Sequence, residues 1–194
     1  SYNGEFETVH HDFTNGDYIV PMGKTLIINQ LCEYGGSYYI KVDNVYVGET
    51  DAESSHQMNL ILPLVVSQNR NIGIAESNGP VNASTFQGIL INNLIESVHH
   101  DFINGDYLVP ENKTLVIYNL YGSQPNSLYI NSTKVFTMNT TKIGDGIRIP
   151  IYAESSNNIS NPTHTGLSTL HGILIDNSNY TYATDYELID ALNE

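Results

Sequence analysis

Two histidines followed by an aspartate occur twice in the chain, and no other short motif is better suited to hold a metal ion. The copies are His10-His11-Asp12 and His99-His100-Asp101. In an extended strand, residues two apart point to the same face, so each copy offers one pair of ligands. A zinc site needs three or four protein ligands, and no neighbouring residue completes either pair. We therefore favour a structural role, in strand pairing or a surface hydrogen bond, over a metal site at these residues: His10, Asp12, His99 and Asp101.

Carboxylate-rich loops offer a second place for an ion. Calcium prefers oxygen ligands, and these are plentiful at Asp43-Asn44, in residues 49–53 and at Asp145. None of these segments has the spacing of a known calcium loop. A solvated acidic surface is the favoured interpretation, and calcium is the one cofactor that the sequence leaves open.

No sequence pattern indicates catalysis. The Gly-x-Ser-x-Gly motif of hydrolases is absent, and Cys32 has no basic neighbour that would activate a thiolate. Cys32 is also the only cysteine, so the chain can form no internal disulfide. We expect a protein that is not an enzyme.

The elements that carry these residues form a unit that occurs twice. Residues 9–21 return as residues 98–110, and the two copies end on the same tetrapeptide, Gly-Ile-Leu-Ile, at 88–91 and 172–175. Self-similarity of this kind indicates a tandem repeat of roughly 85 residues. We expect a first domain over residues 1–91, a second over 92–176 and a tail over 177–194. The linker of Asn92 and Asn93 is so short that it predicts a nearly fixed relation between the domains.

Each unit has the pattern of short strands separated by turns. Residues 38–42 alternate apolar and polar side chains, Asp43-Asn44 predicts a hairpin, and Gly16 is placed to adopt positive φ in a turn. Pro63 and Pro150 interrupt matching strands, which predicts an edge position or a bulge. The fold is therefore expected to be all-β, with two tandem antiparallel β-sandwich repeats of jelly-roll type and a C-terminal extension. The expected strands are 9–13, 18–20, 24–31, 38–42, 45–47, 58–66, 72–75 and 86–91, then 98–102, 107–109, 114–120, 127–130, 134–137, 147–153 and 170–175.

The tail has no counterpart after the first repeat. Its alternating tyrosines predict an amphipathic strand, which could add to an open sheet edge of a neighbouring subunit. A capping box at Thr184–Glu187 predicts instead a helix over residues 185–192, and a frayed terminus is a third alternative. The residues of the expected intersubunit strand are Tyr180, Tyr182, Tyr186 and Leu188.

Composition restricts the partners and the location. Seven basic residues against twenty-one acidic ones give a net charge of −14, which argues against nucleic acid and anionic membranes as partners. No apolar run reaches the ~20 residues of a membrane span. A lysine-poor surface rich in Asn, Ser, Thr and Tyr favours a secreted or cell-surface protein, and the start at Ser1 without Met is consistent with a removed leader or with an artificial boundary. Six sequons could carry glycans if the source glycosylates: Asn82, Asn112, Asn131, Asn139, Asn158 and Asn179.

These features together favour a structural role outside the cell. We expect a self-assembling subunit of a filament, a pilus-like structure or a fibre, with copies of the chain as its partners. The first alternative is a carbohydrate-binding or adhesin module, with exposed tyrosines such as Tyr38, Tyr39, Tyr121 and Tyr129 as sugar contacts. The second is a viral or phage capsid or fibre protein, which would share the fold and differ in its assembly.

Overall fold

The computed structural model of the chain is all-β, as the sequence predicts. It describes residues 6–32, 38–50, 63–76, 85–92, 94–122, 126–138, 150–163 and 166–179. Within these ranges the only helical segments are three single 3-10 turns, at Phe13–Asn15, Phe102–Asn104 and Asn177–Asn179. No helix in the described ranges has the length and apolar character needed to cross a membrane.

The first repeat is a sandwich of two antiparallel four-stranded sheets. One sheet has the order β1-β8-β3-β6 and the other the order β2-β7-β4-β5. This interleaving of early and late strands is the double Greek key of a jelly roll. The strands are β1 (Phe6–Asp12), β2 (Tyr18–Ile19), β3 (Thr25–Cys32), β4 (Tyr38–Val42), β5 (Val45–Thr50), β6 (Leu64–Val66), β7 (Asn71–Glu76) and β8 (Thr85–Ile91).

The second repeat has the same topology. Its sheets have the orders β9-β16-β11-β14 and β10-β15-β12-β13, which match the first repeat strand for strand. The tandem sandwich prediction is thus confirmed. The strands are β9 (Glu96–Asp101), β10 (Tyr107–Leu108), β11 (Lys113–Gly122), β12 (Asn126–Ile130), β13 (Thr133–Met138), β14 (Ile151–Ala153), β15 (Asn158–Ser160) and β16 (Ser168–Asp176).

Local turn chemistry explains where several strands begin and end. Asp43 and Asn44 have φ of 49° and 70°, as the tight hairpin between β4 and β5 requires. Pro63 and Pro150 directly precede β6 and β14, and both strands lie at a sheet edge. The edge prediction for the two prolines is confirmed, because a residue without an N–H is tolerated only where no ladder bond is lost.

Two predicted strands are described only in part, and one observed strand was not predicted. The expected strands 58–66 and 147–153 are described only from β6 and β14 onward, and their first residues lie outside the described ranges. The strand β15 was not predicted, because a short Asn-Ile-Ser segment with one buried residue, Ile159, gives no periodic signal.

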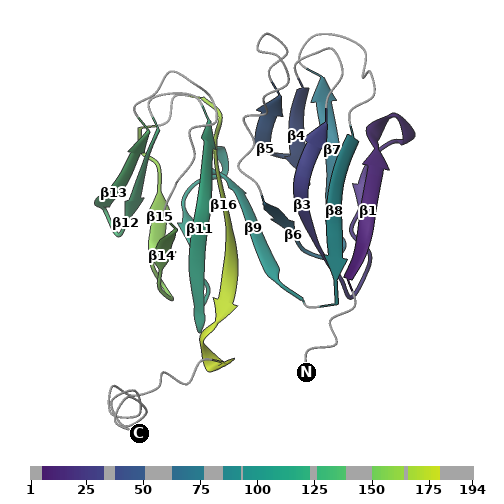
Figure 1. The fold of residues 1–194 in the computed structure, drawn as a ribbon. Coiled ribbons are helices and arrows are strands. Elements are labelled where there is room, and N and C mark those ends of the chain that lie inside the picture. Colours follow the sequence, from purple (N-terminus) through teal and green to yellow (C-terminus); the bar gives the residue numbers. More distant parts are fainter. Residues whose placement is uncertain are drawn as a thin grey trace, which may run out of the picture.

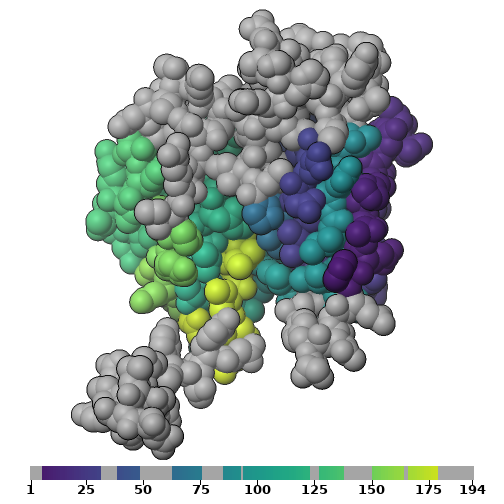
Figure 2. Space-filling view, viewed as in Figure 1, coloured from purple at the N-terminus to yellow at the C-terminus, as the bar shows by residue number. Residues whose placement is uncertain are grey.

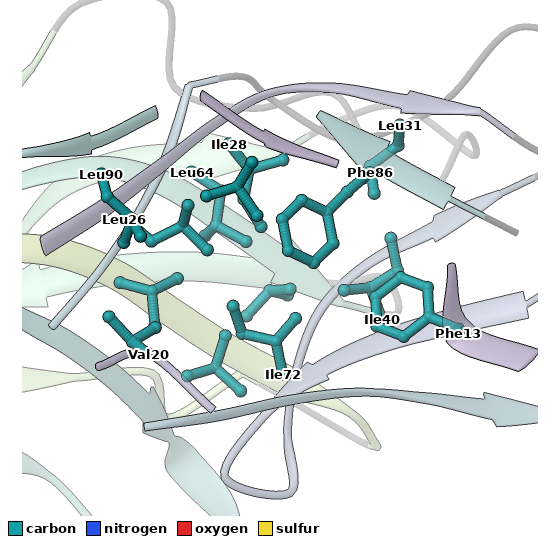
Figure 3. Packing of buried hydrophobic residues seen from close by; sticks show 14 residues of the cluster. Phe13, Val20, Leu26, Ile28, Leu31, Ile40, Leu64, Ile72, Phe86 and Leu90 are labelled. Carbon is teal, nitrogen blue, oxygen red and sulfur yellow. The ribbon is translucent and has the colours of Figure 1, made fainter. Parts of the chain in front are cut away.

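Each sandwich encloses its own hydrophobic core. In the first repeat, Leu26, Phe86 and Leu90 of one sheet point toward Ile40 and Ile72 of the other (Figure 3). The buried residues of β8 alternate with half-buried ones, as expected for a strand with one face in the core. A separate cluster fills the second repeat, so each repeat is stabilised by its own packing.

The two sandwiches lie side by side, with the axes of their long strands roughly aligned (Figure 1). The chain leaves β8 at Ile91 and begins β9 at Glu96, so the linker spans the base of both sheets. Strands β5 and β6 of the first repeat contact the sheet formed by β9, β16 and β11.

Candidate functional site

The repeated histidine–aspartate motif builds a tight turn in each sandwich. The Asp12 carboxylate accepts a hydrogen bond from Thr14 N (2.9 Å), and His11 Nε2 donates to the carbonyl of Gly16 (2.8 Å). Gly16 has φ of 98°, a conformation that favours glycine. The hydrogen bonds from the Thr14 side chain and backbone lower the pKa of Asp12.

The second repeat reproduces this turn. Ile103 N donates to the Asp101 carboxylate (3.0 Å), and His100 Nε2 donates to the carbonyl of Gly105 (2.8 Å). The second histidine of the motif, rather than the first, therefore has the same contact in both repeats. This agrees with the structural role that the sequence favours.

The first histidine has a different environment in each repeat. His10 is exposed on β1, whereas His99 is packed against His171 on the neighbouring strand. No group of three His, Cys, Asp or Glu side chains suited to a metal occurs in the described part of the chain. Metal binding at His10, Asp12, His99 and Asp101 stays a prediction, and Asp12 and Asp101 already serve as turn caps.

Of the carboxylates among the calcium candidates, only that of Asp43 is described. Its carboxylate lies 2.6 Å from Arg70 Nη1 and accepts a hydrogen bond from Asn71 N (2.8 Å). It thus fixes the β4–β5 hairpin against the start of β7. Residues 51–53 and Asp145 lie outside the described ranges, and nothing is known of the Glu49 side chain, so calcium binding stays a prediction.

The edge strands of the two sandwiches meet through two serines. Ser67 N donates to Ser97 Oγ (3.0 Å), and Ser97 N donates to Ser67 Oγ (2.5 Å). The linker is fixed by the same cluster, because Ser67 Oγ is 2.9 Å from the carbonyl of Ile95 and Ile95 N donates to Thr25 Oγ1 (2.9 Å). These part-buried contacts fix the position of one repeat relative to the other.

A pair of histidines lies at the centre of the same interface. His99 of β9 and His171 of β16 are direct partners in the ladder, and their Nδ1 atoms are 3.1 Å apart. The His171 side chain is 0% exposed. Its Nε2 lies 2.9 Å from Thr169 Oγ1, which donates to the carbonyl of Tyr46 in the first repeat (2.7 Å).

The direction of these hydrogen bonds follows from the carbonyl of Tyr46, which is the last group in the series. A carbonyl only accepts, so Thr169 donates its proton to Tyr46 and accepts from His171 Nε2. His171 Nδ1 is then unprotonated and accepts from His99 Nδ1. The remaining nitrogen, His99 Nε2, is buried without a well-formed hydrogen bond.

The surroundings keep the pair neutral. Burial lowers the pKa of His99 to about 4, and the positive charge of Arg70 adds to this shift, while the backbone of Val65 and the carboxylate of Asp43 oppose it. Burial and the neighbouring His99 lower the pKa of His171 well below its ordinary value. Protonation of either ring therefore opposes the contact between the repeats.

An open groove of about 980 Å³ lies beside this interface, at the ends of the strands. Its charged side chains come from both repeats, with Arg70 on one side and Glu96, Lys113 and Asp176 on the other. Lys113 Nζ lies 3.0 Å from the Glu96 carboxylate and 3.9 Å from that of Asp176. Aliphatic residues complete the lining: Leu94, Ile95, Ile173, Leu174 and Ile175.

The other predicted sites are only partly described. Asn112 and Asn131 are exposed, whereas the Asn158 amide donates to the Asp106 carboxylate (2.8 Å) and would lose this contact if it were glycosylated. Asn82, Asn139 and the side chain of Asn179 lie outside the described part of the chain. So do all residues of the expected intersubunit strand, Tyr180, Tyr182, Tyr186 and Leu188.

Sequence reasoning missed the interface residues. His171 belongs to no motif, and the serines Ser67 and Ser97 are common surface residue types. The signal that could have found them is a position-by-position comparison of the repeats, because Gln87 stands opposite His10 where His171 stands opposite His99.

Comparisons with known proteins give only distant likenesses. No family model matches the chain, and no curated protein is significantly similar to it. A conserved protein of unknown function from Pseudomonas aeruginosa PAO1 is similar at 10% identity and a TM-score of 0.27, over 88% of this chain and 78% of that one. HutD from Pseudomonas fluorescens SBW25 is similar at 11% identity and a TM-score of 0.25, over 88% and 77%. Likenesses this remote carry no argument about function.

Proposed function

We propose that the chain is a non-enzymatic extracellular structural protein whose copies assemble into a filament or fibre. The observation that carries this proposal is the kind of contact between its repeats. The β5–β6 edge of the first sandwich packs on the outer face of the β9–β16–β11 sheet of the second. Different surfaces meet, so the contact is heterologous, and a heterologous contact can be repeated from copy to copy.

The shared topology of the repeats gives each chain a second set of the same two surfaces. The β13–β14 edge of the second repeat corresponds to the β5–β6 edge, and the outer face of β1, β8 and β3 corresponds to the covered sheet face. The extracellular location rests on the acidic, lysine-poor composition. Growth through a terminal strand lent by residues 177–194 remains an additional proposal.

Light scattering and electron microscopy of the full chain test the assembly. We expect a mass that rises with protein concentration and elongated particles of regular width. A single monomeric species up to the highest soluble concentration contradicts the proposal. Deleting residues 177–194 separates the two routes, because assembly that survives the deletion does not need a lent strand.

The groove between the repeats supports one alternative, a binding module. Its volume of about 980 Å³ is at the upper end of ligand pockets, roughly 300–1,000 Å³. Lys113, Glu96 and Gln68 could hydrogen bond to sugar hydroxyls, but no aromatic residue lines the described groove to stack on a sugar ring. Binding to a glycan array that is lost in the Lys113→Met variant would favour this function. The viral capsid alternative predicts closed shells in the same micrographs.

A further inference from the structure

We propose that copies of the chain join head to tail by repeating the contact that already joins the two repeats. The β13–β14 edge of one copy would dock on the outer face of the β1–β8–β3 sheet of the next. This inference rests on the proposed function and names its partner surface, a second copy of this chain.

The free face of the first repeat preserves the positions that make the internal contact. His10 stands opposite Gln87 as His99 stands opposite His171, and Thr85 lies opposite Asp12 as Thr169 lies opposite Asp101. The hydroxyl of Thr85 is thus placed like that of Thr169, which donates to the carbonyl of Tyr46. Even the bulge is repeated, after Ile28 in β3 and after Ile117 in β11.

The free edge of the second repeat preserves the other half of the contact. Tyr152 pairs with Val116 as Val65 pairs with Ile27, and Lys134 pairs with Tyr129 as Tyr46 pairs with Lys41. The acceptor that Tyr46 supplies is a backbone carbonyl, so Lys134 can supply the same group. Side-chain identity at this position therefore does not prevent the contact.

The side chains of the β5–β6 edge and of the β13–β14 edge differ in how far they are exposed. Val47 of β5 belongs to the buried core of its own repeat, whereas Val135, at the corresponding bulge position of β13, is 41% exposed. Tyr152 of β14 is 62% exposed. Val65, the counterpart of Tyr152 on the edge that faces the other repeat, is half-buried. The free edge thus leaves an aromatic and an aliphatic side chain at the surface.

The free face is more polar than the covered one. Thr8, His10 and Asn29 are exposed there, and β1 and β8 form an open side of the molecule in Figure 2. Each of these side chains can form hydrogen bonds, as Ser97 and His99 do at the matching positions. A polar face keeps the single chain soluble, so we expect an association that is weaker than the internal contact and depends on concentration.

Paired cysteines test the geometry directly. The Oγ atoms of Ser67 and Ser97 are 2.9 Å apart, so in a Cys32→Ser background the pair Ser67→Cys and Ser97→Cys is expected to form a disulfide within one chain. The corresponding pair at the free surfaces is Thr8→Cys and Glu154→Cys. When these two variants are placed on one chain, mild oxidation is expected to give a ladder of disulfide-linked multimers.

Mixing the two single variants supplies the matched control. A protein with Thr8→Cys and a protein with Glu154→Cys are expected to form the mixed dimer in excess of both homodimers. A second, independent variant is Val135→Glu, which is expected to abolish assembly, whereas Leu108→Glu on β10, also at an exposed apolar residue, is expected to leave it unchanged.

The outcomes separate this inference from the proposed function. The head-to-tail contact is wrong if the Ser67→Cys and Ser97→Cys pair forms its disulfide but the chain with Thr8→Cys and Glu154→Cys gives no ladder. It is also wrong if the mixed dimer of the two single variants forms no more often than expected at random. If no ladder forms but the Cys32→Ser chain without added cysteines assembles in light scattering, the proposed function stands and copies meet through another surface. If that chain stays monomeric at every concentration, both are wrong.

Discussion

The buried histidine pair predicts that mild acid destabilises the chain, and replacing His99 by asparagine should remove much of this sensitivity. The amide nitrogen of asparagine can take the place of His99 Nδ1 and donate to His171, but it does not titrate. His10 occupies the matching position in the first repeat and is exposed. The His10→Asn variant is therefore the matched control.

The magnitude follows from the difference between the folded and unfolded pKa. The pKa of His99 is about 4 in the folded chain, against 6.5 for an ordinary histidine. Burial disfavours the protonated form of His99 in the folded chain, so the unfolded chain binds the proton at a higher pH. The free energy of unfolding therefore falls as the pH falls from 6.5 to about 4. The complete loss is roughly 3.4 kcal/mol, and at pH 5.5 it is about 1.4 kcal/mol.

Urea unfolding at pH 8 and at pH 5.5 measures this loss, at a dilution where the chain is monomeric. The wild type and His10→Asn are expected to lose at least about 1.4 kcal/mol between the two pH values, because His171 shifts in the same direction. His99→Asn is expected to lose less by about that amount. The carboxylates with lowered pKa, Asp12 and Asp176, titrate below this window. An equal loss in His99→Asn and wild type would refute the assignment of a neutral pair.

Three further predictions concern the core of the first repeat, the repeated turn and the serine contact between the repeats. Phe86→Ala removes a side chain that is 0% exposed and should cost about 3–5 kcal/mol of unfolding free energy in urea titration, whereas Phe6→Ala, at a residue that is 69% exposed, should be nearly neutral. Asp12→Ala removes the cap of the first turn and should lower the melting temperature, with Asp101→Ala as its equivalent in the second repeat. Ser67→Ala and Ser97→Ala should show a coupling of about 0.5–3 kcal/mol in a double-mutant cycle, because each serine hydrogen bonds to the other; additive effects would mean that the serines act independently.

The sequence predicted what is decided locally. The hairpin at Asp43-Asn44, the turn at Gly16 and the edge position of Pro63 depend on the chemistry of a few adjacent residues, and all three appear as expected. The two-sheet architecture follows from strand periodicity, which is also local.

The candidate site could not be predicted in the same way. The environment of His99 depends on residues far away in the chain, since Val65 and Arg70 of the first repeat act on it across the interface. Which sandwich surfaces meet is a tertiary property that leaves no periodic trace. The sequence therefore identified the motif and favoured a structural role for it, but it could not reveal that in the second repeat the first histidine packs against His171.

A comparison of the two first histidines gives a final prediction about assembly. His10 and His99 are the same residue at the same ladder position, but they differ in their ladder partner, Gln87 or His171, and in whether a sandwich edge covers them. If copies stack head to tail, His10 becomes covered in turn, and its protonation should oppose the stacking.

Acidification is expected to have the opposite effect on non-specific association of the chain. The chain carries a net charge of −14 at pH 7 and has a pI near 4.6, so acidification reduces the repulsion between copies and should favour any non-specific association. Light scattering at pH 8 and pH 5.5 therefore distinguishes the two effects by sign. Loss of assembly at pH 5.5 that the His10→Asn variant prevents would place His10 in the contact. Assembly that grows on acidification in both proteins would show that His10 stays in water, because only a buried imidazole makes protonation costly for the contact.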